Sequence, residues 1–133
     1  PKVYKSAYDL INKYKQTQTK LVSISGCNDI ILKPLNDYFG FDHTISTKLE
    51  INNKKITGLL QGEYVLKNIK KRRALKYILY NNFKLSKTAF YADSINDFPL
   101  MNIVNYPFLI NPDQKMKSLV LNKKYEFLEW TNS

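Results

Sequence analysis

The stretch that decides the fold is residues 90–101, FYADSINDFPLM. An apolar run from Thr88 to Ala92 leads directly into two carboxylates four residues apart, Asp93 and Asp97, and a helical pattern follows at once. A buried strand that ends at Asp93 would place both acids at the carboxyl end of a sheet, where open α/β sheets bind their ligands. Two carboxylates with few other acids nearby suit a hard cation that prefers oxygen ligands, so the stretch predicts a Mg²⁺ site.

A structural role for the two acids is the alternative. Asp93 would then cap the loop, and Asp97 would lie at the start of the following helix, where a negative charge is favoured. The acidic stretch alone does not separate these two interpretations.

Length and composition place the chain among ordinary globular proteins. Its 133 residues are enough for one domain with a core, and 44% of them are hydrophobic and 24% charged. We find no apolar run of membrane-spanning length and no signal-peptide pattern. The single cysteine, Cys27, excludes an internal disulfide and favours a cytoplasmic location, and the single histidine, His43, argues against a zinc site.

The chain is strongly basic, with 21 Lys and Arg against 11 Asp and Glu, a net charge of +10. This excess is typical of proteins that bind nucleic acid, an anionic membrane surface or an anionic substrate. A general compositional bias toward Lys, Asn and Ile is the simpler explanation.

Apolar periodicity predicts alternating helices and strands, hence an α/β fold with a mostly parallel sheet, helices on both faces and a small β-hairpin. We expect Gly26 to end the first strand and Gly40 to end the second helix. One domain is expected over residues 1–133. The predicted helices cover 3–16, 29–39, 66–82, 97–104 and 113–122, and the predicted strands cover 21–25, 44–51, 55–60, 88–92, 106–110 and 125–130.

Two hydroxyl residues, Ser23 and Ser25, close the first predicted strand just before Gly26. Hydroxyl and backbone donors followed by a helix start, which Asn28 would cap, form a candidate phosphate-binding site. The alternative is that Ser25 and Asn28 only shape the turn and the helix start.

The basic run from Lys67 to Lys76 opens the longest predicted helix. Most of its members are expected on a solvated face. Lys71 points along the stripe of Leu75 and Ile78, and a lysine on the core side needs an anionic partner. Lys70, at the edge of that stripe, is the second candidate. Together with the serines and acids, such a lysine would complete a phosphate-plus-Mg²⁺ site.

These motifs in this order resemble the haloacid dehalogenase superfamily, and most closely its phosphoserine-phosphatase-like branch, subfamily IB. The resemblance implies a Rossmann-like core and a Mg²⁺-dependent phosphomonoester hydrolase acting on a small phosphorylated substrate. It implies that Ser23 and Lys71 hold the phosphoryl group, and that Asp93 and Asp97 bind or orient the metal. The matching segments are LVSIS (21–25), ITG (56–58), the helix near Lys71, YADSINDFPL (91–100), LINPD (109–113) and Trp130.

The family's first motif, Asp-x-Asp-x-Thr, is missing, because none of the seven Asp residues has another Asp two positions later. In the family this motif supplies the nucleophile that becomes an aspartyl phosphate. We therefore expect the chain to be the C-terminal portion of such an enzyme, without the N-terminal strand and the cap. A preceding segment or a complementary chain would supply the nucleophile, and an uncovered sheet edge would favour self-association.

A second functional hypothesis is a non-catalytic binding module. It would use the basic helix Lys67–Lys76 to bind nucleic acid or anionic lipid, with an affinity that falls steeply with salt. Most of the aromatic residues lie on predicted apolar stripes and are expected in the core, which disfavours a base-stacking surface. The substrate of the hydrolase stays open among phosphoserine, a phospholipid head group and a nucleotide.

Overall fold

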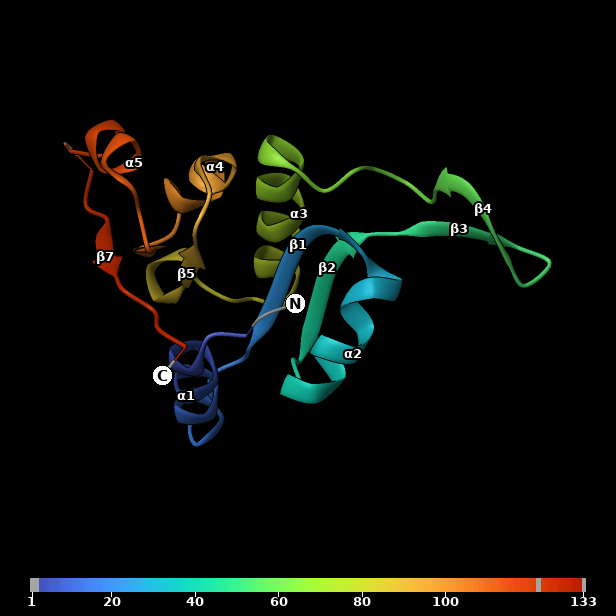
Figure 1. Ribbon diagram of the computed structural model, residues 1–133, viewed down its shortest axis with the longest axis horizontal. Helices are drawn as coiled ribbons and strands as arrows, with labels where there is room; N and C mark the ends of the chain where they lie inside the picture. Colours follow the sequence, from blue (N-terminus) through green and yellow to red (C-terminus); the bar gives the residue numbers. More distant parts are fainter. Residues whose placement is uncertain (1–2, 122, 133) are drawn as a thin grey trace.

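The computed structural model describes residues 3–121 and 123–132, and its helices and strands alternate as the sequence predicts (Figure 1). The helices are α1 (Lys5–Lys15), α2 (Asp29–Phe39), α3 (Lys67–Tyr80), α4 (Phe98–Met101) and α5 (Gln114–Leu119), with 3₁₀ turns η1 (Leu85–Lys87) and η2 (Ile95–Asp97). The strands are β1 (Val22–Asn28), β2 (His43–Thr47), β3 (Leu49–Asn52), β4 (Lys55–Leu60), β5 (Ala89–Ala92), β6 (Tyr106–Ile110) and β7 (Glu126–Leu128). The predicted α/β class is confirmed.

The parallel strands form two sheets within the described residues. β1 pairs with β2, while β5, β6 and β7 form a second parallel sheet in that order. β3 and β4 form the predicted antiparallel hairpin, which extends away from the rest of the molecule (Figure 1). Among the residues described, β1 and β5 each have one edge without a strand partner.

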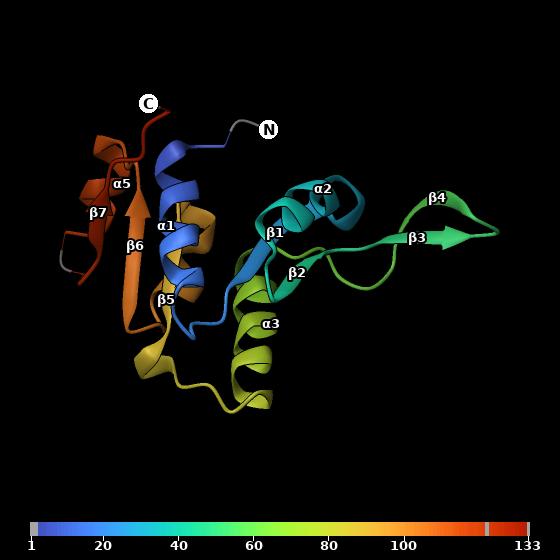
Figure 2. The ribbon, with the colours of Figure 1, turned by 90° about the horizontal axis from the view of Figure 1, so that it is seen from below.

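Helices cover both faces of the β5–β6–β7 sheet. Side chains alternate along β5, so neighbouring residues contact helices on opposite faces. Phe90 and Ala92 pack into a core cluster with Met101 of α4 and with residues of β6 and α5. Tyr91 faces the other way, stacks on Phe108 at 4.5 Å between ring centroids and meets the Tyr14 hydroxyl of α1 at 2.8 Å. α1 accordingly lies against β5 and β6 (Figure 2). Burial and the Tyr14 hydrogen bond raise the pKa of Tyr91.

A second core cluster joins the two parallel sheets. Its buried residues are Ala74 of α3, Leu100 of α4 and Val104. Ile24 of β1 and Phe90 of β5 both pack against it. Helices α3 and α4 therefore pack on one another between the two sheets, so that β1 and β5 meet the same helical layer.

Gly26 does not end the first strand, so that prediction was wrong. β1 continues through it to Asn28. The reason for glycine here is a close approach: a Cβ at Gly26 would lie 2.8 Å from Cδ2 of Leu66 and 3.1 Å from the carbonyl oxygen of Val65. Gly40 does end α2, in the left-handed conformation at φ 65°.

The predicted strand 44–51 is two strands separated at Lys48, which corrects the sequence interpretation. Its first half, β2, is a core strand with Ile45, Ser46 and Thr47 all buried. Only its second half, β3, belongs to the hairpin. The predicted helix 113–122 ends at Leu119, and residue 122 lies outside the described residues. Cys27 is exposed. Among the described residues, every helix is too short or too polar to span a membrane.

Replacing Gly26 with alanine is expected to destabilise the protein by about 1–3 kcal/mol, because the new methyl group overpacks the contact with Val65 and Leu66. Urea unfolding measures this change, with Cys27→Ala as the control at the neighbouring exposed position. Equal stability of the two variants would show that the Val65–Leu66 segment moves aside freely.

The His43 ring stacks on Tyr77 at 4.4 Å between centroids and joins β2 to α3. Partial burial, followed by the charges of Lys48 and Arg73, lowers the pKa of His43 from its ordinary value of 6.5. Since the folded state disfavours the charged ring, the unfolded chain binds the proton more readily, and stability falls as pH drops below that value. We expect the urea midpoint to decrease as the pH is lowered from about 7.5 to about 5, and to decrease less in His43→Gln. An equal decrease in both proteins would show that His43 does not cause the pH dependence.

Candidate active site

A buried ion pair links α3 to the acidic loop. Lys70, in the first turn of α3, is 8% exposed, and Asp97, at the end of η2, is 7% exposed. The Lys70 Nζ donates a hydrogen bond to Oδ1 of Asp97 at 2.5 Å. A buried charge is tolerated only when it is paired, so the burial of Lys70 depends on Asp97 and the burial of Asp97 depends on Lys70.

Lys70 rather than Lys71 lies on the buried stripe of α3, which corrects the helical-wheel prediction. The buried positions are Lys70, Ala74 and Ile78, whereas Lys71 is half-buried. The prediction relied on Leu75, which is only half-buried, as Lys71 is. The spacing of four residues from Lys70 to Ala74 and on to Ile78 was the signal that pointed to Lys70.

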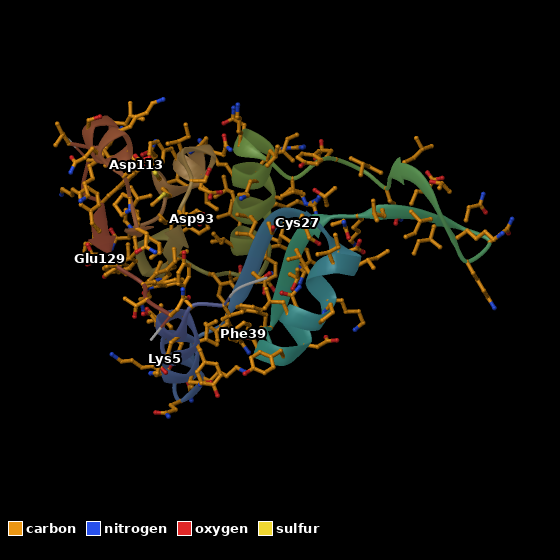
Figure 3. The ribbon with its side chains drawn as sticks, viewed as in Figure 1. Lys5, Cys27, Phe39, Asp93, Asp113 and Glu129 are labelled. Atoms are coloured by element: carbon orange, nitrogen blue, oxygen red, sulfur yellow. The ribbon has the colours of Figure 1, made fainter. Side chains whose placement is uncertain are left out.

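The two acids of the loop occupy different environments. β5 ends at Ala92, and Asp93 follows as an exposed residue between β5 and α4 (Figure 3). The Ser94 Oγ accepts a hydrogen bond from the N–H of Asn96 at 3.2 Å and starts η2. This turn carries the chain inward, so that Asp97 is buried beside Lys70 while Asp93 stays accessible.

The serines of β1 occupy a neighbouring strand. Ser23 is in register with Thr44 of β2, and the Ser25 Oγ accepts a hydrogen bond from the N–H of Cys27 at 3.0 Å. Within the described part of the chain, no hydrogen bond joins either hydroxyl to Lys70, Asp93 or Asp97. The Asn28 Oδ1 caps α2 through the N–H of Ile31 at 2.9 Å. The hydrogen bonds of Ser25 and Asn28 match the structural alternative for these two residues.

Val65 sets the position of the start of α3. It is fully buried, and its N–H donates to the Oγ1 of Thr47, the last residue of β2, at 3.0 Å. Its carbonyl oxygen lies close to Gly26 of β1. Because Lys70 follows five residues later, these contacts hold its helix at the carboxyl ends of β1 and β2.

The described residues offer two carboxylates, Asp93 and Asp97, that could bind a metal. No group of three or more His, Cys, Asp or Glu side chains gathers in residues 3–121 and 123–132. Asp93 is exposed, and Asp97 already gives Oδ1 to Lys70. Hard carboxylate oxygens fit Mg²⁺, which usually keeps several waters and takes one or two carboxylates with phosphate oxygens. The chemistry of the two carboxylates therefore fits Mg²⁺, for which Asp93 would be the accessible ligand.

Removing the Lys70 ammonium leaves Asp97 buried and unpaired, so Lys70→Ala is expected to cost about 3–5 kcal/mol of folding stability. Lys71→Ala, the matched control one residue later, should cost under about 0.5 kcal/mol. Urea unfolding of both variants distinguishes the two lysines, and an equal cost would contradict the assignment of Lys70.

Two curated relatives are similar to most of this chain. It is 30% identical over 125 residues to a histidinol-phosphatase of Neisseria meningitidis serogroup C, covering 91% of this chain and 56% of the relative. It is 28% identical over 97 residues to a phosphoserine phosphatase of Streptococcus thermophilus, covering 73% of this chain and 45% of the relative. The chain thus spans about half the length of the curated relatives it matches.

Solved structures share the fold. A probable phosphoserine phosphatase from Vibrio cholerae superposes with a TM-score of 0.77 at 21% identity, covering 87% of this chain and 36% of that one. The family model for haloacid dehalogenase-like hydrolases matches residues 1–102, most of the chain. The protein accordingly belongs to the haloacid dehalogenase-like hydrolase family.

Proposed function

We propose that this chain forms one side of the active site of a Mg²⁺-dependent phosphomonoester hydrolase. The observation that carries the proposal is the buried pair of Lys70 with Asp97, which lies in the same loop as the exposed carboxylate of Asp93. A cation held at a helix start and a free acid at the end of a parallel strand suit a phosphate group and its metal. Family membership and the phosphatase names of the relatives support the same reaction class.

Each residue has a distinct role in this proposal. Asp97 holds the Lys70 ammonium in a fixed position, and Lys70 offers its remaining donors to the phosphoryl oxygens. Ser23 and Ser25 supply hydroxyl donors from β1. Asp93 would hold Mg²⁺, which when bound stabilises negative charge on the phosphoryl oxygens. Lys70 thereby takes the role that the sequence resemblance implied for Lys71.

The nucleophile lies outside this chain in the proposed mechanism. A carboxylate on an added segment attacks phosphorus, the ester oxygen leaves, and water later hydrolyses the aspartyl phosphate. The free edges of β1 and β5 support the addition of a strand between these elements. The segment would come from the same polypeptide or from a complementary chain.

Small phosphomonoesters are the proposed substrates, by analogy with the names of the relatives. The alternative of a binding module built on the basic helix is not favoured. Lys70 is buried in its own ion pair, and Arg72 is paired with Glu63. The run Lys67–Lys76 is thus not one continuous free cationic face.

The test uses the protein that carries an Asp-x-Asp-x-Thr segment upstream of Pro1, identified from the reading frame. Hydrolysis of p-nitrophenyl phosphate with Mg²⁺ should fall by at least about 10²-fold in kcat for Asp93→Asn and for Lys70→Ala. Lys76→Ala, an exposed control on the same helix, should stay within about threefold. Equal losses in all three variants would contradict the proposal, as would full activity after removal of Mg²⁺ with a chelator.

The isolated 133-residue chain is expected to show no phosphatase activity, because it contains no nucleophile of the expected kind. The same assay, run at high protein concentration with and without Mg²⁺, checks this. Mg²⁺-dependent turnover by the isolated chain that Asp93→Asn abolishes would place the nucleophile within residues 1–133 instead.

A further inference from the structure

The start of α3 lacks the local features that usually fix the first turn of a helix. Its N-cap is Leu66, which forms no side-chain cap hydrogen bond, and its first turn holds no acid. Lys67 and Lys70 instead bring positive charge to this end of the helix, where the helix dipole disfavours it. Contacts with other segments must therefore fix where the helix begins.

Lys67 has a backbone conformation that a lysine seldom adopts. Its φ is +46°, in the left-handed region, where the Cβ of an ordinary residue crowds the following carbonyl oxygen. The N–H groups of Ile69 and Lys70 both donate to the carbonyl oxygen of Leu66, at 3.0 and 3.2 Å, so the first helical turn is built across this strained residue. Such strain persists only where the surrounding structure holds it, and it is concentrated at functional sites.

Thr47 supplies a polar contact that holds the segment before Lys67. Thr47 is only 2% exposed, and its Oγ1 accepts a hydrogen bond from the N–H of the fully buried Val65 at 3.0 Å. Gly26 of β1 lies so close to the Val65 carbonyl oxygen that an added Cβ would come within 3.1 Å of it. Without the Thr47 hydroxyl, the buried Val65 N–H would lose this acceptor, which is costly. Thr47 therefore opposes relaxation of the strained helix start.

We propose that Thr47 is a positioning residue, which fixes the Lys70 ammonium beside Asp97 by holding Val65 and the strained Lys67 in place. Lys70 lies three residues after Lys67, and the 2.5 Å between its Nζ and Oδ1 of Asp97 leaves little room for a shift of the helix start. The consequence for turnover rests on the proposed function, in which Lys70 contacts the phosphoryl oxygens. Thr47 acts through Lys70 and contacts no reacting atom.

Labelling of lysines with acetic anhydride, read by mass spectrometry, tests the position of Lys70 without an assay of activity. Lys70 is nearly inaccessible and should react slowly. Thr47→Val keeps the shape but removes the acceptor, and should raise the labelling rate of Lys70 more than about fivefold. Thr47→Ser keeps the hydroxyl and should raise it less than about twofold. Val120→Ala, a cavity in the other core cluster, is the destabilised control and should behave like Thr47→Ser.

Relief of the strain at Lys67 provides a rescue experiment. Glycine adopts a positive φ freely, so Lys67→Gly should raise the urea midpoint, whereas Lys67→Ala, which keeps a Cβ, should not. In Thr47→Val/Lys67→Gly the helix start no longer depends on Thr47. Labelling of Lys70 should therefore return to within about twofold of that in Lys67→Gly, and should stay high in Thr47→Val/Lys67→Ala.

Hydrolysis of p-nitrophenyl phosphate by the same variants, in the protein with the upstream segment, measures the effect on turnover. Thr47→Val should lower kcat more than about tenfold, and Thr47→Ser should restore it. Full activity of Asp93→Asn would contradict the proposed function, while the labelling of Lys70 would still decide whether Thr47 positions it. Equal labelling of Lys70 in Thr47→Val and Val120→Ala would overturn the proposal, and raised labelling with unchanged kcat would overturn its consequence for turnover.

Discussion

The hydrogen-bonded ion pair between Lys70 and Asp97 is the interaction on which the arrangement of the site depends. Both side chains are nearly inaccessible, so neither charge is stable in place without the other. The pair ties the first turn of the longest helix to the loop after β5. The pair thereby anchors the end of the loop in which Asp93 stays exposed.

A second constraint places this helix relative to the strands. Gly26 lets the Val65–Leu66 segment lie against β1, and Thr47 binds the same segment from β2. Neither contact belongs to the candidate site. Together they decide where the helix begins, and hence where the Lys70 ammonium lies.

The sequence predicted the elements well, because apolar periodicity reports which face of each element is buried. It predicted β6 to the residue, and it identified the strand that leads into Asp93. It failed where a contact between distant segments decides the outcome. A glycine after an apolar run usually marks the end of a strand, yet Gly26 lies within β1. Glycine is needed there because Leu66 approaches its backbone closely. Lys70 and Lys71 differ by one helical position, and the contact with Asp97 shows which of the two lysines is buried. Ser23 and Ser25 were singled out for their hydroxyls, and no described contact tests that choice.

The division of the parallel strands into two sheets has a consequence for cooperativity. Within the described residues, strands β1 and β2 share no backbone ladder with β5, β6 and β7, so side-chain packing and the connecting chain join the two sheets. The main apolar contact between the two sheets is the cluster of Ala74, Leu100 and Val104, which we call the seam. The Lys70–Asp97 pair also links these two parts of the molecule. Such a molecule can open in parts, because loss of the seam leaves each ladder intact. A strand inserted at the seam would do more than add residues: it would turn two separately opening units into one.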